Sequence, residues 1–294
     1  MGIVVIGAVF VDIKGYPEDV FVAKGRNVAE DIANVELRPT FVSLVDDTGI
    51  GADVIHKLRN HQVNTDYIRV TPDGMGTWLA VFENDGDVAA SISKRPNLAP
   101  IGDILDEKGE EIFRDADSIV IEIDMDKDVV KRVFRLAQKY DKRVYAVVAN
   151  MSIAVERRDF LQQTECFVCN QLEAGILFSD DYSTLDAQQM EQVLAEKVRR
   201  ANIKSMIVTM GAEGAVYAHR DGSSGFCPAR NVKVKDTTGA GDAFCAGVAI
   251  GLTYGKTMEE ACQIGSHLAA SVIMTSENVC PRFLPGELGL DVTV

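Results

Sequence analysis

The sequence has no long apolar run and little positive charge, and each absence excludes a class of protein. No uninterrupted apolar stretch approaches the roughly 20 residues that a membrane-spanning helix needs. The 44 acidic residues outnumber the 30 basic residues, which gives a net charge of −14 at pH 7. A chain this acidic repels nucleic-acid phosphates and anionic membrane surfaces. We therefore expect neither a nucleic-acid polymer nor a membrane among its partners.

Signals of targeting and of modular architecture are also missing. The chain shows no basic segment followed by an apolar run and a cleavage site, no internal repeat and no Pro/Ser-rich linker. We therefore expect a cytoplasmic protein. The 294 residues, 47% of them apolar and 25% charged, suffice for one large α/β domain or two ordinary ones.

The six cysteines are scattered through a chain too large to need disulfide staples, so we expect reduced, buried thiols. Cys166 and Cys169 form a CxxC pair, which suggests zinc or redox chemistry as the alternative. That alternative lacks a second CxxC pair and a nearby pair of histidines to complete a tetrahedral site.

Unalternating apolar runs of strand length recur along the chain and are separated by helical patterns. Such runs are typical of a parallel sheet that is covered on both faces. The expected strands cover 2–8, 118–123, 143–148, 165–169 and 205–210. The expected helices cover 28–35, 51–61, 127–140, 187–202, 240–254 and 258–276. This alternation predicts the α/β class.

One region departs from this alternation. Residues 67–70, 77–83 and 87–93 are short strand candidates, with Asp73-Gly74 and Asp85-Gly86 at the turns between them. We interpret them as a β-meander. With a further strand from 13–24, the segments 13–24 and 66–94 would form a small sheet that serves as a lid over a site.

The segment Asp236-Thr237-Thr238-Gly239-Ala240-Gly241-Asp242-Ala243-Phe244 precedes an apolar helical pattern. The N–H groups of Gly239, Ala240 and Gly241 would lie unpaired at the start of that helix, where they attract an anion such as phosphate. Asp242 would repel such an anion unless it serves to accept the proton of an attacking hydroxyl. The alternative is an ordinary helix start with Thr238 as its N-cap.

As a nine-residue string, DTTGAGDAF resembles the signature of the PfkB carbohydrate kinases, the ribokinase-like family. Further matches follow in the family's order over nearly the whole chain. The resemblance implies a ribokinase-like three-layer α/β/α sandwich with a mostly parallel central sheet and a small β-sheet lid. It also implies a single kinase domain over residues 1–294, ATP and Mg²⁺ as cofactors, Asp242 as the catalytic base, and Gly239, Ala240 and Gly241 as the anion hole.

On the substrate side, Gly7 to Asp12 resembles the family's first strand and the aspartate that follows it, so Asp12 is expected to accept hydrogen bonds from sugar hydroxyls. Gly25 and Asn27 resemble the helix start that contacts the sugar. Here the chain departs from the family, because Val22-Ala23 replaces the usual pair of glycines and Asp46 replaces another glycine. We expect lid closure to flex at Gly15 or Gly25 instead.

On the nucleotide side, the resemblance places five residues against ATP: Thr209, Gly211, Gly214, Thr237 and Ser266. Asn170 and Glu173 resemble the family's NxxE motif and would position hydrated Mg²⁺. A helix N-cap with a capping-box glutamate has the same spacing and is the alternative. Asp236 and Thr238 resemble residues that hold a monovalent cation, K⁺, in many relatives.

Within the family, the best local resemblance is to pseudouridine kinases, on the residues Asp12-Ile13-Lys14-Gly15-Tyr16 and Gly25-Arg26-Asn27. It implies transfer of the γ-phosphate of ATP to a primary hydroxyl of pseudouridine. A ribokinase-like or fructokinase-like sugar kinase is the first alternative, and a family member that binds a sugar or nucleoside without turnover is the second. Exposed edges of the lid strands lead us to expect a homodimer.

Overall fold

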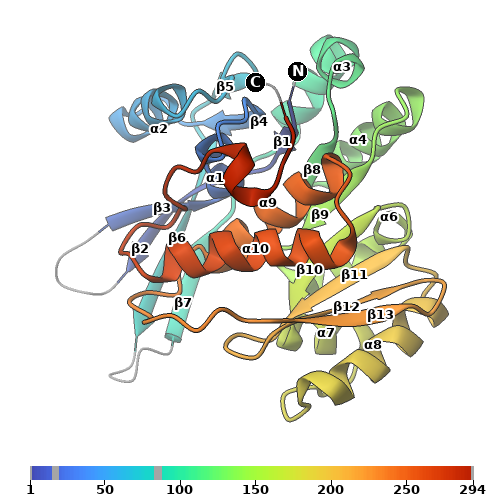
Figure 1. The fold of residues 1–294 in the computed structure, drawn as a ribbon. Coiled ribbons are helices and arrows are strands. Elements are labelled where there is room, and N and C mark those ends of the chain that lie inside the picture. The colour runs from blue at the N-terminus through green and yellow to red at the C-terminus, as the bar shows by residue number, and fades with distance from the viewer. Residues whose placement is uncertain (1, 15–19, 83–87, 293–294) are drawn as a thin grey trace.

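A computed structural model of the protein describes residues 2–14, 20–82 and 88–292 (Figure 1). Within these residues the strands form two sheets, one of nine strands and one of four. The larger sheet has the order β13-β12-β11-β10-β9-β8-β1-β4-β5. Its strands are β1 (Val4–Ile6), β4 (Thr40–Val45), β5 (Ile68–Val70), β8 (Ile119–Glu122), β9 (Val144–Val147), β10 (Cys166–Asn170), β11 (Ser205–Thr209), β12 (Gly214–His219) and β13 (Ser224–Pro228).

The larger sheet is mostly parallel. All neighbouring strands from β11 to β5 pair in parallel, and the pairs β11–β12 and β12–β13 are antiparallel. Four of the five expected strands match β8 to β11 closely, whereas the first shortens to β1. The buried strand β4 lies next to β1 and was not predicted.

Helices cover both faces of this sheet. Their bounds are α1 (Gly25–Asn34), α2 (Gly49–Asn60), α3 (Ala99–Arg114), α4 (Lys127–Lys139), α5 (Met151–Ala154), α6 (Arg158–Leu161), α7 (Gln171–Phe178), α8 (Ala187–Arg200), α9 (Ala240–Thr253) and α10 (Met258–Ile273). Two 3-10 turns add η1 (Val155–Arg157) and η2 (Pro285–Leu288). The six expected helices are confirmed to within a few residues at their ends, while α3 and α7 were not predicted.

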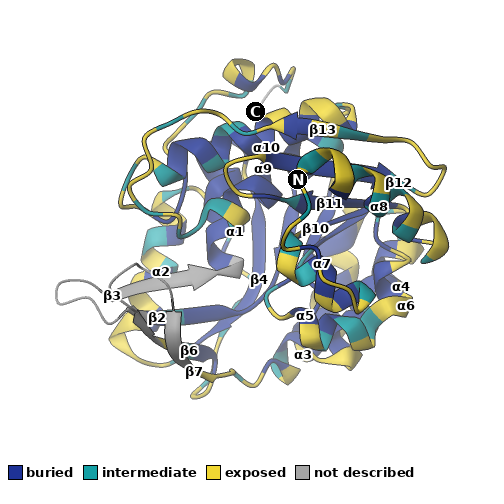
Figure 2. Cartoon of the chain, turned by 90° about the horizontal axis from the view of Figure 1, so that it is seen from below, coloured by how far each residue is buried: buried dark blue, intermediate teal, exposed yellow. Residues whose placement is uncertain are grey.

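Side chains of each strand alternate between two apolar clusters, as the two-residue period of a strand requires. Val4 and Ile6 point into the cluster that packs against α3, α4, α7 and α8. Val5 points into the opposite cluster, which packs against α1, α2, α9 and α10. The sheet is therefore the buried middle layer of a three-layer α/β/α sandwich (Figure 2).

The smaller sheet has the order β3-β2-β6-β7, with β2 (Val9–Lys14), β3 (Val20–Lys24), β6 (Met75–Phe82) and β7 (Val88–Lys94). The antiparallel pairing of β6 with β7 and the added strand within 13–24 agree with the expected β-meander, which is wrong in two other respects. The segment Ile68–Val70 pairs in parallel with β4 and belongs to the larger sheet. Strand β6 pairs in parallel with β2, which comes from the beginning of the chain. The turn Asp85-Gly86 and the hinge candidate Gly15 lie outside the described residues.

Asp12 also lies elsewhere than expected. The first strand of the larger sheet ends at Ile6, and the chain then starts a separate strand, β2, in the smaller sheet. Asp12 therefore projects from the lid, opposite Trp78 of β6, rather than from the end of the central strand.

The order of the larger sheet reverses at β1. From β1 the chain builds β4 and β5 on one side, and it then returns to build β8 and the remaining strands on the other. Ligands of open α/β sheets bind in the crevice at such a point, beyond the carboxyl ends of the strands. For this sheet that place lies between the ends of β1 and β8.

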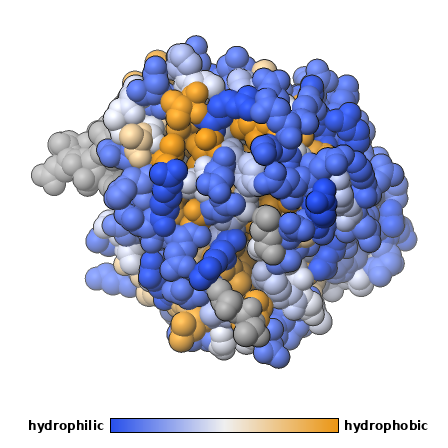
Figure 3. Space-filling view, turned by 90° about the horizontal axis from the view of Figure 1, so that it is seen from above, coloured by the Kyte–Doolittle hydropathy of each residue, from blue (hydrophilic) through white to orange (hydrophobic). Residues whose placement is uncertain are grey.

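Among the described residues, no helix is both long and apolar enough to cross a bilayer. The face drawn in Figure 3 is predominantly hydrophilic, and apolar residues reach it only in scattered patches. This surface is in keeping with the net charge of −14.

Candidate active site

Helix α9 begins at a turn that no side chain caps. Its N-cap is Gly239, in the left-handed region at φ +83°, so Thr238 is not the N-cap. The Thr238 N–H donates instead to Asp236 Oδ1 at 2.8 Å. The Ala240 N–H donates to the Thr237 carbonyl at 3.3 Å, which corrects the expectation that it is unpaired. Within the described residues, the N–H groups of Gly239 and Gly241 have no protein acceptor.

Two glycines of this turn have different reasons for being glycine. A Cβ on Gly239 would lie 2.0 Å from the Asn278 carbonyl oxygen, and its positive φ disfavours any other residue. A Cβ on Gly241 would meet nothing within 4 Å. The Asn278 backbone thus closes the turn from behind, and the Gly241 side is open to a ligand.

The Asp242 carboxylate lies in the first turn of α9 and meets the buried start of α1. Asn27 Nδ2 donates to Asp242 Oδ2 at 3.0 Å across 215 positions of the sequence. Asn27 is fully buried, and its Oδ1 accepts a bond of 3.3 Å from Arg26 Nη2. The structure therefore brings Asp242, the predicted catalytic residue, together with Asn27, one of the three residues predicted on the substrate side, and Asn27 orients the carboxylate.

Behind Asn27, α1 carries a buried ionic network that sequence reasoning missed. Glu30 has no exposed surface and lies 3.6 Å from Arg26 Nε, 3.3 Å from Lys57 Nζ and 3.3 Å from His61 Nε2. The pKa of His61 is lowered, chiefly by burial, while the nearby Glu30 opposes that shift. A signal was available in the sequence, because Glu30 and Asp31 stand between the apolar pairs Val28-Ala29 and Ile32-Ala33.

Asp31 anchors the segment that closes the anion turn. Its Oδ1 accepts the Cys280 N–H at 2.6 Å, and Asn34 Nδ2 donates to the Cys280 carbonyl at 2.6 Å. Burial raises the pKa of Asp31, hydrogen bonds from Cys280 oppose the shift, and the charge of Asp242 adds to it. Helix α1 thus holds both Asp242 and the backbone behind Gly239.

A groove of about 470 Å³ opens beside the anion turn. All five predicted nucleotide-binding residues line it, together with Ala240 and Gly241 of the turn: Thr209, Gly211, Gly214, Thr237 and Ser266. Sequence reasoning missed part of its wall, formed by the connection from Ala229 to Val234 and by Phe244 and Ile273. The groove runs from Ser266 of α10 to Ala240 and Gly241 at the start of α9.

Asn170 and Glu173 have the geometry of a capping box at the start of α7. The Asn170 side chain accepts the Glu173 N–H at 2.8 Å, and Glu173 Oε2 accepts the Asn170 N–H at 2.8 Å. Asn170 also ends β10 directly beside Thr209, at the edge of the groove. The oxygens of this pair suit hydrated Mg²⁺, which prefers oxygen ligands and keeps several waters.

The alternative of a zinc or redox site finds no support at Cys166 and Cys169. All six cysteines are buried and free, as predicted. Burial raises the pKa of both thiols, which disfavours the thiolate that metal binding and redox exchange require.

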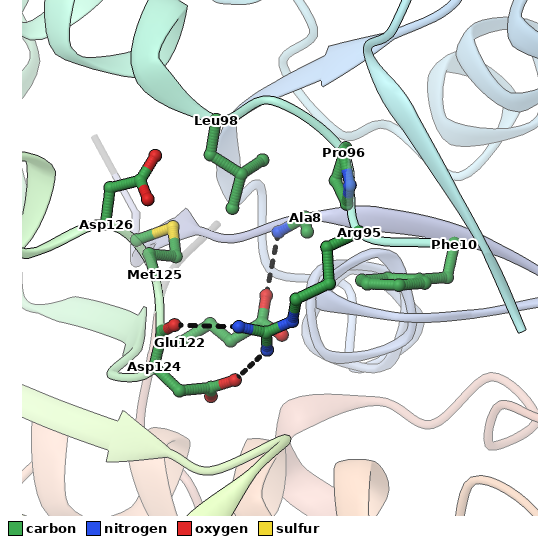
Figure 4. A pocket seen from close by; sticks show the side chains of 9 residues that line it. All are labelled: Ala8, Phe10, Arg95, Pro96, Leu98, Glu122, Asp124, Met125 and Asp126. Atoms are coloured by element: carbon green, nitrogen blue, oxygen red, sulfur yellow. Dashed lines mark hydrogen bonds and ion pairs between the residues drawn. The ribbon is translucent and has the colours of Figure 1, made fainter. Parts of the chain in front are cut away.

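A second cavity lies at the reversal point of the sheet, and its residues were missed by sequence reasoning (Figure 4). Glu122, the last residue of β8, accepts the Ala8 N–H through Oε2 at 2.8 Å. Asp124 forms an ion pair with Arg95 and accepts the Ala149 N–H at 2.9 Å. The rule that ligands bind beyond the ends of parallel strands could have identified both acids, because the strand 118–123 was predicted.

Comparison with known proteins shows the family to which the chain belongs. The profile of the pfkB family carbohydrate kinases matches residues 24–280. The chain belongs to this family. The kinase is 34% identical over 292 residues to guanosine-inosine kinase of Exiguobacterium acetylicum, covering 94% of this chain and 95% of the relative. It is 21% identical to ribokinase of Schizosaccharomyces pombe over 85% of this chain and 79% of the relative.

Solved structures show the same fold. Arabidopsis thaliana ribokinase, complexed with ribose and ATP, superposes with a TM-score of 0.79 at 19% identity and covers 99% of both chains. Adenosine kinase from Sinorhizobium meliloti superposes with a TM-score of 0.76 at 19% identity, covering 96% of this chain and 95% of that structure. The predicted ribokinase-like fold is confirmed, and the protein is a phosphotransferase with an alcohol group as acceptor.

The comparisons support a sugar or nucleoside kinase that uses ATP. They do not support the narrower resemblance to pseudouridine kinases, because the relative that is 34% identical is named guanosine-inosine kinase.

Proposed function

We propose that this kinase transfers the γ-phosphate of ATP to the 5′-hydroxyl of a nucleoside, with guanosine and inosine as its preferred substrates. The observation that carries the proposal is the 34% identity to a guanosine-inosine kinase over nearly the full length of both chains. The cavity beyond β1 and β8 is in keeping with it, because it lies where ligands of open α/β sheets bind and is lined by Phe10 of β2, the strand that also carries Asp12.

In this mechanism Asp242 accepts the proton of the 5′-hydroxyl while that oxygen forms a bond to the γ-phosphorus and the bond to the β-phosphate oxygen breaks. The Asn27 amide holds the carboxylate at 3.0 Å in the orientation that this transfer needs. The unpaired N–H groups of Gly239 and Gly241 stabilise the negative charge on the phosphoryl group. Asp12 and the start of α1, from Gly25 to Asn27, hold the sugar.

The groove beside α9 would hold ATP, with Thr209, Gly211, Gly214, Thr237 and Ser266 along its wall. When bound near Asn170 and Glu173, Mg²⁺ would neutralise phosphate charge that Asp242 otherwise repels. Asp236 and Thr238 remain the proposed site of a K⁺ ion. We test both ions by measuring turnover with Mg²⁺ omitted, and with K⁺ replaced by tetramethylammonium.

The substrate is tested by following ADP release with guanosine, inosine, adenosine, pseudouridine, uridine, ribose and fructose at equal concentrations. We expect guanosine and inosine to exceed the others in kcat/KM. A lead of more than ~10-fold for ribose or fructose, or about 1.4 kcal/mol of discrimination, would overturn the nucleoside assignment. A lead for pseudouridine would overturn the preference for purines, and binding without any ADP formation would identify a non-catalytic protein.

We also propose that the kinase acts as a cytoplasmic homodimer that pairs through its lid. Leu79 and Ile92 are cross-strand neighbours on the lid and are 38% and 72% exposed, an apolar pair that a second lid could cover. Light scattering of the purified protein gives its mass in solution. A monomer at micromolar concentration would refute the dimer without affecting the kinase proposal.

A further inference from the structure

The cavity beyond β1 and β8 combines apolar walls with one cation and the carboxylates of Glu122, Asp124 and Asp126. Phe10, Leu98 and Met125 supply its apolar surface, and Arg95 reaches it from the connection that follows β7 (Figure 4). The Arg95 side chain is 41% exposed. A cation beside apolar walls is suited to a flat, polar-edged ligand rather than to a simple sugar.

The guanidinium of Arg95 is held in place from one side. Asp124, which has no exposed side-chain surface, forms the ion pair with Nη2, and the Asp124 carbonyl accepts from Nη1 at 3.3 Å. Asp124 is itself fixed by the Ala149 N–H at 2.9 Å. These two bonds use two of the five N–H donors, and no other acceptor of Arg95 occurs within the described residues. The remaining donors form a pre-oriented fork.

The cavity adjoins the strand that carries Asp12, one of the residues expected to hold the sugar. Phe10 lines the cavity, and Asp12 lies two residues further along β2, on the same face of that strand. A Cβ on Gly76 would lie 2.5 Å from the Phe10 ring, so Gly76 makes the space in which the ring rests against the lid. A nucleoside whose ribose meets Asp12 would therefore extend its base past Phe10 toward Arg95.

We propose that this cavity is the base subsite and that Arg95 selects 6-oxopurines by donating to O6 and N7 of guanine or hypoxanthine. An arginine fork matches these two adjacent acceptors. Adenine presents an amino donor beside N7, and uracil has no second acceptor next to O4, so neither pairs with the fork in this way. The inference rests on the proposed nucleoside kinase activity and specifies how its substrate is chosen.

A cycle of substrate and protein variants tests the contact. The wild-type kinase should use 7-deazaguanosine, in which a carbon replaces N7, with kcat/KM at least about 10-fold below that of guanosine. Arg95→Lys keeps the charge beside buried Asp124 but loses the fork. It should lower kcat/KM for guanosine about 10- to 100-fold, and it should bring guanosine and 7-deazaguanosine to within about threefold of each other.

Arg69→Lys is the matched control, because Arg69 pairs at 2.8 Å with Glu107 on the exposed edge of the sheet, away from both cavities that hold the site. This variant should keep kcat/KM for guanosine and for 7-deazaguanosine within about twofold of the wild-type values. Equal kcat/KM for guanosine and 7-deazaguanosine in the wild type would overturn the proposal even without a variant. Discrimination that persists in Arg95→Lys would also overturn it. In both cases guanosine turnover would leave the proposed function standing, whereas turnover of ribose alone would refute both.

Discussion

Replacing Gly239 with alanine tests whether the turn before α9 is held against a fixed backbone. The new Cβ would lie 2.0 Å from the Asn278 carbonyl oxygen and 2.8 Å from its carbonyl carbon. Asn278 cannot retreat easily, because Cys280, two residues on, is bonded at both its N–H and its carbonyl to Asp31 and Asn34 of α1, each at 2.6 Å. The turn must therefore move instead.

The expected cost has two parts. The left-handed backbone at φ +83° costs roughly 1–2 kcal/mol for a residue with a Cβ, and relief of the overlap adds about 1–3 kcal/mol, as in overpacked cores. A contact of 2.0 Å must lengthen by about 1 Å to become tolerable, and a displacement of that size can cost about 100-fold in rate. We expect turnover to fall by about that factor while the protein remains folded but less stable.

The assay measures ADP release at saturating ATP and nucleoside, together with the melting temperature. Gly255→Ala is the matched control for backbone strain, because Gly255 has the same φ of +83° but nothing within 4 Å of the added Cβ. It should lose stability and keep its turnover. Wild-type turnover in Gly239→Ala would refute the reasoning, and so would an equal loss in Gly255→Ala.

Three further predictions concern the carboxylates of the site and their partner. Asp242→Asn should lower turnover at least ~10²-fold. Its ATP affinity, measured by calorimetry, should stay within a few-fold of the wild-type affinity. Retained turnover would contradict the role of Asp242 as the base. Asn27→Ala removes the donor 3.0 Å from Asp242 and should lower kcat/KM about 10- to 100-fold, whereas an unchanged value would show that the carboxylate is oriented by other groups. Burial raises the pKa of Asp31 well above 3.8. Between pH 3.8 and that raised pKa the folded protein binds more protons than the unfolded chain, so the stability of the wild type falls as the pH rises. Asp31→Asn lacks this titration, so its melting temperature should rise relative to that of the wild type as the pH is raised from 5 to 8. A difference in melting temperature that does not change with pH would contradict this account.

The parts that the sequence predicts well are those governed by local pattern. Buried parallel strands appear as continuous apolar runs, so β8 to β11 were predicted close to their observed bounds. The turn from Asp236 to Asp242 carries its chemistry within seven residues, and its groove contains all five residues predicted to face the nucleotide.

The failures concern pairing between distant segments. Residues 68–70 have the same strand character whether they join the lid or the central sheet, and only the pairing with β4 decides between them. Similarly, no local pattern shows that Glu30 will meet Lys57 of α2 and His61, the residue that follows α2. Arg95 and Asp124 are 29 positions apart and become one unit only because β7 ends near the end of β8.

The loss of the family's glycines at Val22-Ala23 has a structural consequence. These residues lie within β3, where they pair with Val11 and Phe10 of β2, so they move with the lid as part of a paired strand. Helix α1 follows directly from Gly25 and is fixed to the core through Glu30 and Asp31. We propose that rotation of the lid against the core is absorbed at the junction of β3 and α1, where Gly25 has the widest conformational freedom. Because Asn27 follows two residues later, movement at this junction acts directly on the residue that orients Asp242.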